Sequence, residues 1–274
     1  MFSKLYLSFT CNLGIASGLY CIHNTELVNK RFSKNISNIY TFKNSFNFKK
    51  VYADEWVENW DSMGPSGKQE TTYRTLIFIR HGEYSKESLG LNTLGKKQSL
   101  DAAKRLKQIT ECGCKIVRLH CSSSQRSIET MEIIKDHLKE DDLPEVEISD
   151  FAIEGPPCRN EPGTLKLGLR EKRTLFNASC RIEASYREVF FRPKCDHNKE
   201  TIEVFIGHAN VQRYYITRSL QLPLEGWLRF QQKACTFTEF KISDTGVVTL
   251  VSSSETISKR EKRCTRRKRS KKNG

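Results

Sequence analysis

From residue 74 onward the chain alternates short apolar runs with segments whose apolar residues recur every three or four positions. Strands that alternate with helices normally build a mainly parallel sheet covered on both faces, so this pattern predicts a three-layer α/β/α domain. The runs typical of buried strands are RTLIFIR (74–80), KIVRLHC (115–121), VEIS (146–149) and TIEVFIG (201–207). The segments with helical spacing are 93–109, 125–138, 181–191 and 210–220.

The first of these helices has both a start signal and an apolar face. Asn92 stands where an N-cap is expected. The residues expected to face the core are Leu94, Ala102, Ala103, Leu106 and Ile109.

The end of this region is typical of an antiparallel hairpin. Residues 234–242 and 247–251 are rich in β-branched and aromatic residues and are separated by a DTG turn. The expected sheet is therefore mainly parallel with an antiparallel edge. The chain divides into an N-terminal segment (1–50), a tryptophan-containing linker (51–72), the α/β domain (73–252) and a basic tail (253–274).

The N-terminal segment is uncharged at first and then basic. Residues 5–22 carry no charge and are mostly apolar, whereas residues 23–50 hold six Lys or Arg against Glu26 alone. This arrangement favours a mitochondrial targeting or membrane-anchor segment, with a cleaved secretory signal and an unstructured terminus as alternatives. The ten cysteines follow no disulfide or zinc-ligand spacing, which argues for reduced thiols and against secretion.

The basic tail carries most of the net charge of +14. Residues 259–272 hold ten Lys or Arg and one Glu, so the rest of the chain is only mildly basic. The tail could be a nuclear address, a nucleic-acid contact, a contact with an anionic surface, or a solvated end. The overall charge is therefore no reason to classify the domain itself as a nucleic-acid binder.

Two of the three tryptophans lie in the sequence WVENWD (56–61), just before the domain. Large aromatic side chains outside a domain need a surface on which to bury. Trp56, Asn59, Trp60 and Asp61 could dock on their own domain or insert into a partner subunit. The spacing favours neither alternative.

Two predicted strands end in a histidine. His81 follows the first strand and His208 follows TIEVFIG, each beside a glycine that would let backbone approach a ligand closely. In an open α/β sheet, ligands bind beyond the carboxyl ends of the strands. The sequence therefore predicts that the two imidazoles share one site.

Arginines join this predicted site. Arg80 precedes His81, and Arg126 begins the helix after the strand KIVRLHC. Two guanidinium groups beside two imidazoles suit a phosphate dianion, because guanidinium forks onto phosphate oxygens and neutral imidazole is a nucleophile near pH 7. A leaving alkoxide would need a proton, for which Glu154 is the preferred donor and Glu83 the competitor.

These motifs together resemble the histidine phosphatase, or phosphoglycerate mutase-like, superfamily. The matching segments are Arg80-His81-Gly82-Glu83, Asn92 to Gln98, and Ser122 to Thr130. Three later segments, Arg181 to Arg187, Phe205 to Tyr214 and Leu220 to Arg229, resemble a mitochondrial, membrane-anchored serine/threonine protein phosphatase branch of that superfamily. The resemblance covers about residues 74–251 and extends to WVENWD, although Val57 and residues 159–180 depart from the pattern.

The resemblance implies a role for each site residue. His81 would become phosphohistidine, Arg80, Arg126 and His208 would bind the phosphoryl group, and Glu154 would donate the proton. Gly82, Glu83 and Ala209 would complete the phosphate pocket. The branch also implies a homo-oligomer built through the tryptophan motif, a phosphoprotein substrate, and no metal or organic cofactor.

Two other functions remain open at this point. The chain could be a small-molecule phosphatase or mutase that uses the same phosphohistidine. It could instead be a non-enzymatic multimeric scaffold, although the four central residues are all present. Location at a mitochondrial membrane is the first expectation, and a nucleus reached through the basic tail is the alternative.

Overall fold

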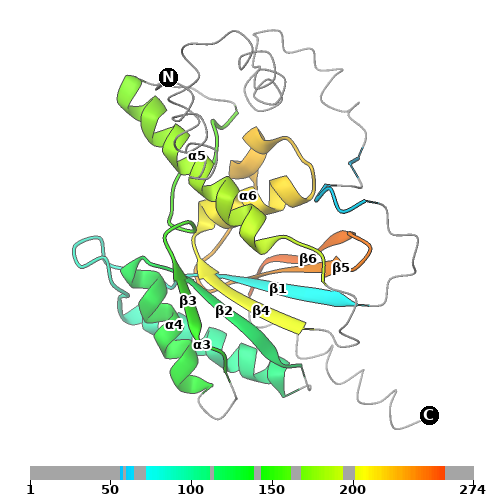
Figure 1. Cartoon of the computed structure of the whole chain (residues 1–274). Helices are drawn as coiled ribbons and strands as arrows, with labels where there is room; N and C mark the ends of the chain where they lie inside the picture. The colour runs from blue at the N-terminus through cyan, green and yellow to red at the C-terminus, as the bar shows by residue number, and fades with distance from the viewer. Residues whose placement is uncertain are drawn as a thin grey trace, which may run out of the picture. The chain divides into compact units, whose positions relative to one another are not determined.

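The computed structural model describes residues 56–57, 60–64, 72–111, 114–138, 143–161, 168–193 and 201–256. Their central element is a six-stranded sheet with the order β3-β2-β4-β1-β5-β6 (Figure 1). The strands are β1 (Tyr73–Arg80), β2 (Ile116–Ser122), β3 (Val146–Ser149), β4 (Thr201–Gly207), β5 (Phe237–Ser243) and β6 (Val248–Glu255).

The first four strands of the chain are parallel, and the last two form the expected antiparallel edge. The hairpin between β5 and β6 turns at Gly246, which has a positive φ of 95°. The hairpin was expected to begin at residue 234, but Cys235 also has a positive φ (51°), and β5 starts only at Phe237.

Helices cover both faces of the sheet, which confirms the three-layer prediction (Figure 1). Their bounds are α3 (Thr93–Thr110), α4 (Gln125–His137), α5 (Leu169–Val189) and α6 (Ala209–Ser219), followed by the 3₁₀ helix η3 (Leu224–Arg229). Helix α3 begins as predicted, because the Asn92 side chain accepts a hydrogen bond from the backbone N–H of Gly95.

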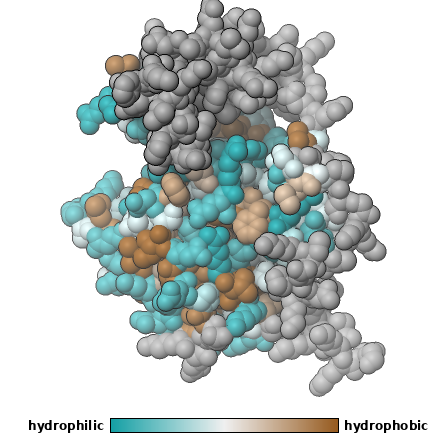
Figure 2. Space-filling view, in the orientation of Figure 1, coloured by the Kyte–Doolittle hydropathy of each residue, from teal (hydrophilic) through white to brown (hydrophobic). Residues whose placement is uncertain are grey.

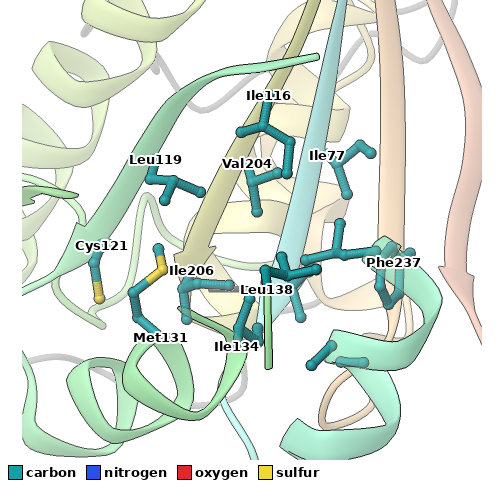
Figure 3. Close-up of a cluster of buried hydrophobic side chains, with 14 of the residues drawn as sticks. Ile77, Ile116, Leu119, Cys121, Met131, Ile134, Leu138, Val204, Ile206 and Phe237 are labelled. Carbon is teal, nitrogen blue, oxygen red and sulfur yellow. The ribbon is translucent and has the colours of Figure 1, made fainter. Parts of the chain in front are cut away.

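Each face of the sheet has its own apolar core. On one face, Ile77 of β1 and Val204 of β4 point toward Met131 and Ile134 of α4 (Figure 3). On the other face, aromatic residues dominate, with the Phe78 ring stacked on Phe205 at 4.8 Å between centroids. Because each face of the sheet has its own core, both odd- and even-numbered residues of a strand are buried, as expected for a sheet with helices on both faces.

Three sequence expectations about the helices were incomplete. Leu94 was expected to face the core, but it is 54% exposed, because the buried face of α3 begins at Gly95 and Ser99. Helix α5 was expected over 181–191, but it begins at Leu169, where exposed polar residues hide its amphipathic pattern. The helix η3 was not predicted.

On the face shown in Figure 2, the described residues that are visible are mostly hydrophilic, with apolar residues exposed in small separate groups. Among all the described residues, no helix is both long and apolar enough to cross a membrane. The apolar segment 5–22 and the basic stretch 259–272 lie outside the described residues.

The tryptophan motif contacts its own domain through both halves. The backbone N–H of Val57 donates to Gln221 Oε1 at 2.8 Å, and the Gln221 side-chain amide donates to the Val57 carbonyl at 2.9 Å. The indole N–H of Trp60 donates to the Gly246 carbonyl at 2.7 Å, and the Asp61 carboxylate pairs with buried Arg192 at 2.6 Å. Trp56, in contrast, is 53% exposed. Asn59 lies outside the described residues. The motif thus docks on its own domain through Val57, Trp60 and Asp61 and leaves the Trp56 side chain at the surface.

Candidate active site

The carboxyl ends of three adjacent strands, β2, β4 and β1, bring the predicted site residues together. Arg80 at the end of β1 is in register with Gly207 at the end of β4, and the backbone N–H of His81 donates to the Gly207 carbonyl at 2.9 Å. This pairing sets the His81 and His208 rings 5.1 Å apart between centroids. The two histidines, separated by most of the domain in sequence, therefore share one site.

Arg126 lies between the two imidazoles and bonds to both. Its Nε donates to His81 Nε2 at 3.1 Å, and its Nη2 lies 3.3 Å from His208 Nδ1. Guanidinium nitrogens can only donate, so each imidazole presents a lone pair to Arg126. Both rings are therefore neutral in this arrangement.

The remaining ring nitrogens fix the orientation of the histidines. His81 Nδ1 lies 2.8 Å from the Gly82 carbonyl oxygen, which can only accept, so Nδ1 carries the proton and Nε2 carries the lone pair. His208 Nε2 lies 2.9 Å from Ser122 Oγ and 3.2 Å from Ser124 Oγ. These contacts hold the tautomers in which both lone pairs face the centre of the site.

Burial and positive charge keep the imidazoles neutral well below physiological pH. Burial, together with Arg126 and Arg80, lowers the pKa of His81 to about 4 against the opposing hydrogen bond to Gly82. Burial, reinforced by His81 and then by the arginines, lowers the pKa of His208 to about 2. A phosphate dianion would compensate the same positive charge.

Arg80 and Tyr84 complete the walls of the site. The Nη1 of Arg80 donates to the Gln232 carbonyl at 2.8 Å, whereas its buried Nε has no hydrogen-bond partner among the described residues. The Tyr84 ring lies beneath the Arg126 guanidinium at 4.7 Å and meets the His81 ring edge-on at 5.4 Å. Arg80 thus keeps donor capacity that a ligand could use.

Glu154 approaches the site from the loop after β3. Its Oε2 is 3.8 Å from His208 Nδ1, and its Oε1 accepts from the backbone N–H of Asn210 at 3.2 Å. Arg181 of α5 holds the loop by donating to the Ile153 carbonyl at 2.5 Å. Burial raises the pKa of Glu154, against its backbone hydrogen bonds and the two arginines. A raised pKa suits a carboxyl that has to donate a proton.

The side chain of Glu83, the competing donor, is exposed, and only its backbone is fixed by the hydrogen bonds described here. Its N–H donates to Gln98 Oε1 at 3.0 Å, and its carbonyl accepts from the Asn92 N–H. Of the two carboxyls considered, the structure brings Glu154 toward the histidines.

The glycine beside His81 serves packing against α3. A Cβ on Gly82 would lie 2.6 Å from the Gly95 carbonyl oxygen, and a Cβ on Gly95 would fall within 1.9 Å of the Glu83 carbonyl oxygen. The Gly82 N–H is used as well, because it donates to Thr130 Oγ1 at 3.1 Å. Ala209, the first residue of α6, is buried next to His208.

Sequence reasoning missed the residues that orient the site. Ser122 and Ser124 were seen only as part of the motif around Arg126, and Tyr84 and Gln232 were not singled out. A weak signal existed for the serines, since they directly follow β2. Tyr84 and Gln232 gave no signal, because their contacts depend on how distant loops return to the site.

No family model matches the chain. It is 34% identical over 219 residues to the serine/threonine-protein phosphatase Pgam5, mitochondrial, of Caenorhabditis elegans, which covers 72% of this chain and 75% of that protein. It is 32% identical over 224 residues to the protein of the same name in Drosophila erecta (71% and 75%). A solved phosphoglycerate mutase from Plasmodium falciparum is 26% identical, covers 68% of this chain and 94% of its own, and has a TM-score of 0.48. With relatives of this identity and coverage, the chain belongs to the Pgam5 family of the phosphoglycerate mutase-like histidine phosphatases.

Proposed function

We propose that the protein is a phosphoprotein phosphatase that hydrolyses phosphoserine and phosphothreonine through a phosphohistidine at His81. The observation that carries this proposal is Arg126, whose guanidinium bonds the lone-pair nitrogens of both His81 and His208. A nucleophile and phosphate-binding donors thus meet at one point. The serine/threonine specificity rests on the names of the relatives.

In the first step, His81 Nε2 attacks phosphorus, forming the N–P bond while the bond between phosphorus and the seryl oxygen breaks. Arg126 must release both imidazole lone pairs and turn to the phosphate oxygens, where Arg80 also donates. His208 donates there after its proton moves to Nδ1, and the Ser122 and Ser124 hydroxyls then donate to its Nε2. Glu154 gives its proton to the leaving alkoxide. The products of this step are the free hydroxyl amino acid, phosphohistidine and the Glu154 carboxylate.

In the second step, water attacks the phosphohistidine. The Glu154 carboxylate takes a proton from that water, the N–P bond breaks, and inorganic phosphate leaves with His81 restored. The cycle thus needs no group beyond the side chains already named. Ala209, as the first residue of α6, would offer its N–H to a phosphate oxygen. Gly82 and Glu83 would shape the pocket through the backbone contacts described above.

The proposal extends to location and assembly. We infer a mitochondrial, membrane-associated homo-oligomer, with residues 5–22 as the anchor and exposed Trp56 as part of the contact between subunits. The relatives are named as mitochondrial, which supports the location. The basic tail (259–272) remains a candidate contact for an anionic surface or nucleic acid, or a nuclear address. Imaging of full-length and tail-deleted protein separates these locations.

The decisive experiment is acid-labile, base-stable trapping of labelled phosphate from a phosphoserine or phosphothreonine peptide. Label is expected on the wild type and not on His81→Ala. Turnover of the phosphopeptide should exceed turnover of phosphoglycerate. This comparison tests the alternative that the protein is a small-molecule phosphatase. Equal label on the wild type and His81→Ala would refute the mechanism, and preference for phosphoglycerate would refute the substrate class.

A further inference from the structure

Three possible metal ligands converge away from the active site. His120 of β2, Glu147 of β3 and Glu188 of α5 each offer one ligand atom, and these atoms lie within 4.8 Å of one another. His120 and Glu147 are direct register partners across the two strands. The position is therefore set by backbone pairing as well as by side-chain rotamers.

His120 provides a second observation, independent of the carboxylates. The side chain is only 2% exposed, yet neither ring nitrogen has a hydrogen-bond partner among the described residues. Its Nδ1 is aimed at the cluster, 3.7 Å from Glu147 Oε2, which is too long for a hydrogen bond. A buried imidazole whose nitrogens lack hydrogen-bond partners is energetically unfavourable, so its geometry points to a ligand at this position.

The inner side of His120 is also incompletely satisfied. A cavity of about 20 Å³ is lined by His120, His208 and Gln212, among others, and both amide atoms of buried Gln212 lack partners among the described residues. That volume accommodates one water molecule. A water there could bond the second ring nitrogen of His120 and the Gln212 amide together.

We propose that this cluster binds one Zn²⁺ ion through His120 Nδ1 and the carboxylates of Glu147 and Glu188, with water as the fourth ligand. Nitrogen and carboxylate oxygen donors in this number suit four-coordinate zinc. A ligating histidine usually donates its other ring N–H to an outer partner, and a water in the cavity shared with Gln212 would be that partner.

Arg118 contacts both carboxylates of this cluster. Its Nη2 donates to Glu147 Oε2 at 2.5 Å and lies 3.5 Å from Glu188 Oε1. One guanidinium charge leaves the two carboxylates with a surplus negative charge, and His120 Nδ1 stays 3.7 Å from Glu147 Oε2. Zinc and Arg118 therefore compete for the same oxygens, and Arg118, at a side-chain exposure of 18%, borders solvent into which it can turn.

The site would have a structural consequence for catalysis. The ligands join β2, β3 and α5, and the loop that carries Glu154 runs between β3 and α5. Zinc would thus tie together the two elements that support this loop. It takes no part in the bond-making steps.

Calorimetric titration of the full-length protein with Zn²⁺, after its accessible thiols are alkylated, tests the proposal. The wild type should bind one equivalent, and Glu188→Gln, which changes an exposed residue at constant volume, should bind at least tenfold more weakly. Glu132→Gln on α4 is the matched control and should bind as the wild type does. His81→Ala should also retain binding, which excludes a zinc site that requires the His81 imidazole.

Arg118→Met distinguishes a metal site from an ordinary ion-pair cluster. Removing the competing cation should tighten Zn²⁺ binding at least tenfold, and Zn²⁺ should then raise the melting temperature of this variant more than that of the wild type. His120→Phe should abolish both effects. Unchanged or weaker binding in Arg118→Met, or wild-type binding in Glu188→Gln and His120→Phe, would overturn the proposal. A failure of zinc binding would leave phosphohistidine trapping unaffected, so the two proposals are tested separately.

Discussion

Strand β1 carries an arginine near each end, and the two have opposite surroundings. Arg74 is buried and saturated: it bonds both carboxylate oxygens of Glu203, at 2.6 and 2.7 Å, and also the Phe191 carbonyl. Arg80, together with Arg126, has no carboxylate within ion-pair distance among the described residues. The comparison teaches that an arginine already neutralised by a resident carboxylate supports the fold, whereas one that lacks such a partner is available to an anion.

The largest expected effect comes from the active-site arginines that no carboxylate neutralises among the described residues. Arg126→Met should lower kcat/KM for a phosphopeptide by about a thousandfold, because donors aimed at developing charge contribute on that order. Thermal unfolding should change little, since Arg126 bonds to imidazoles and not to a buried carboxylate. Steady-state kinetics beside calorimetric melting checks both halves. A large loss of stability with retained activity would reverse the comparison.

Loss of Arg74, which Glu203 neutralises, should lower stability and leave activity unchanged. Arg74→Met leaves the Glu203 carboxylate buried without its partner, which should cost about 3–5 kcal/mol of unfolding free energy. The double variant Arg74→Met/Glu203→Leu should recover most of that loss. Urea unfolding measures the energies, and kcat of the folded fraction should remain at the wild-type level in both variants.

The pH dependence of activity is a further test, because the active site contains titrating groups whose pKa values are shifted. The nucleophile must be neutral, and the pKa of His81 is lowered to about 4. Once corrected for protonation of the phosphate ester near about pH 6, kcat/KM should therefore hold its level down to near pH 4. An exposed imidazole would lose activity near pH 6.5. The acid must be protonated, so activity should fall as pH rises through the raised pKa of Glu154. Glu154→Gln should be slow and lack this alkaline limb in a pH–rate profile.

The smallest expected effect concerns the ring beneath Arg126. Tyr84→Leu removes the cation–π contact, worth about 0.5–1 kcal/mol at a partly exposed site, and should lower kcat/KM by about two- to fivefold. Tyr84→Phe keeps the ring and should match the wild type. If the phenylalanine variant is as slow as the leucine variant, the hydroxyl and not the ring is the working group.

Topology explains which parts of the site could be predicted. His81, His208 and Arg126 each stand at a strand's carboxyl end or the helix start that follows, and parallel pairing brings such ends together whatever the sequence between them. Glu154 was predictable for the same reason, since it follows β3. The shared position of these residues is a property of the sheet order.

What could not be predicted depends on contacts between segments that no local pattern connects. The hydroxyl contacts of Ser122 and Ser124 with His208 require the rotamer of a side chain more than eighty residues away. The exposure of Leu94 follows from the rotation of α3, which is set by the close approach of Gly95 to the backbone at Glu83. Amphipathic spacing gives a helix, but packing at its first turn decides its rotation.

The orientation of the loop that carries His81 is sensitive to substitution of the paired glycines at positions 82 and 95. Since each lacks the Cβ that would collide with the other segment, a single added methyl at either place would push α3 and the residue after His81 apart. The apolar faces of the sheet would survive that shift, whereas the aim of the imidazole would not. Substitutions at these two positions would therefore yield proteins that fold but lack enzymatic activity.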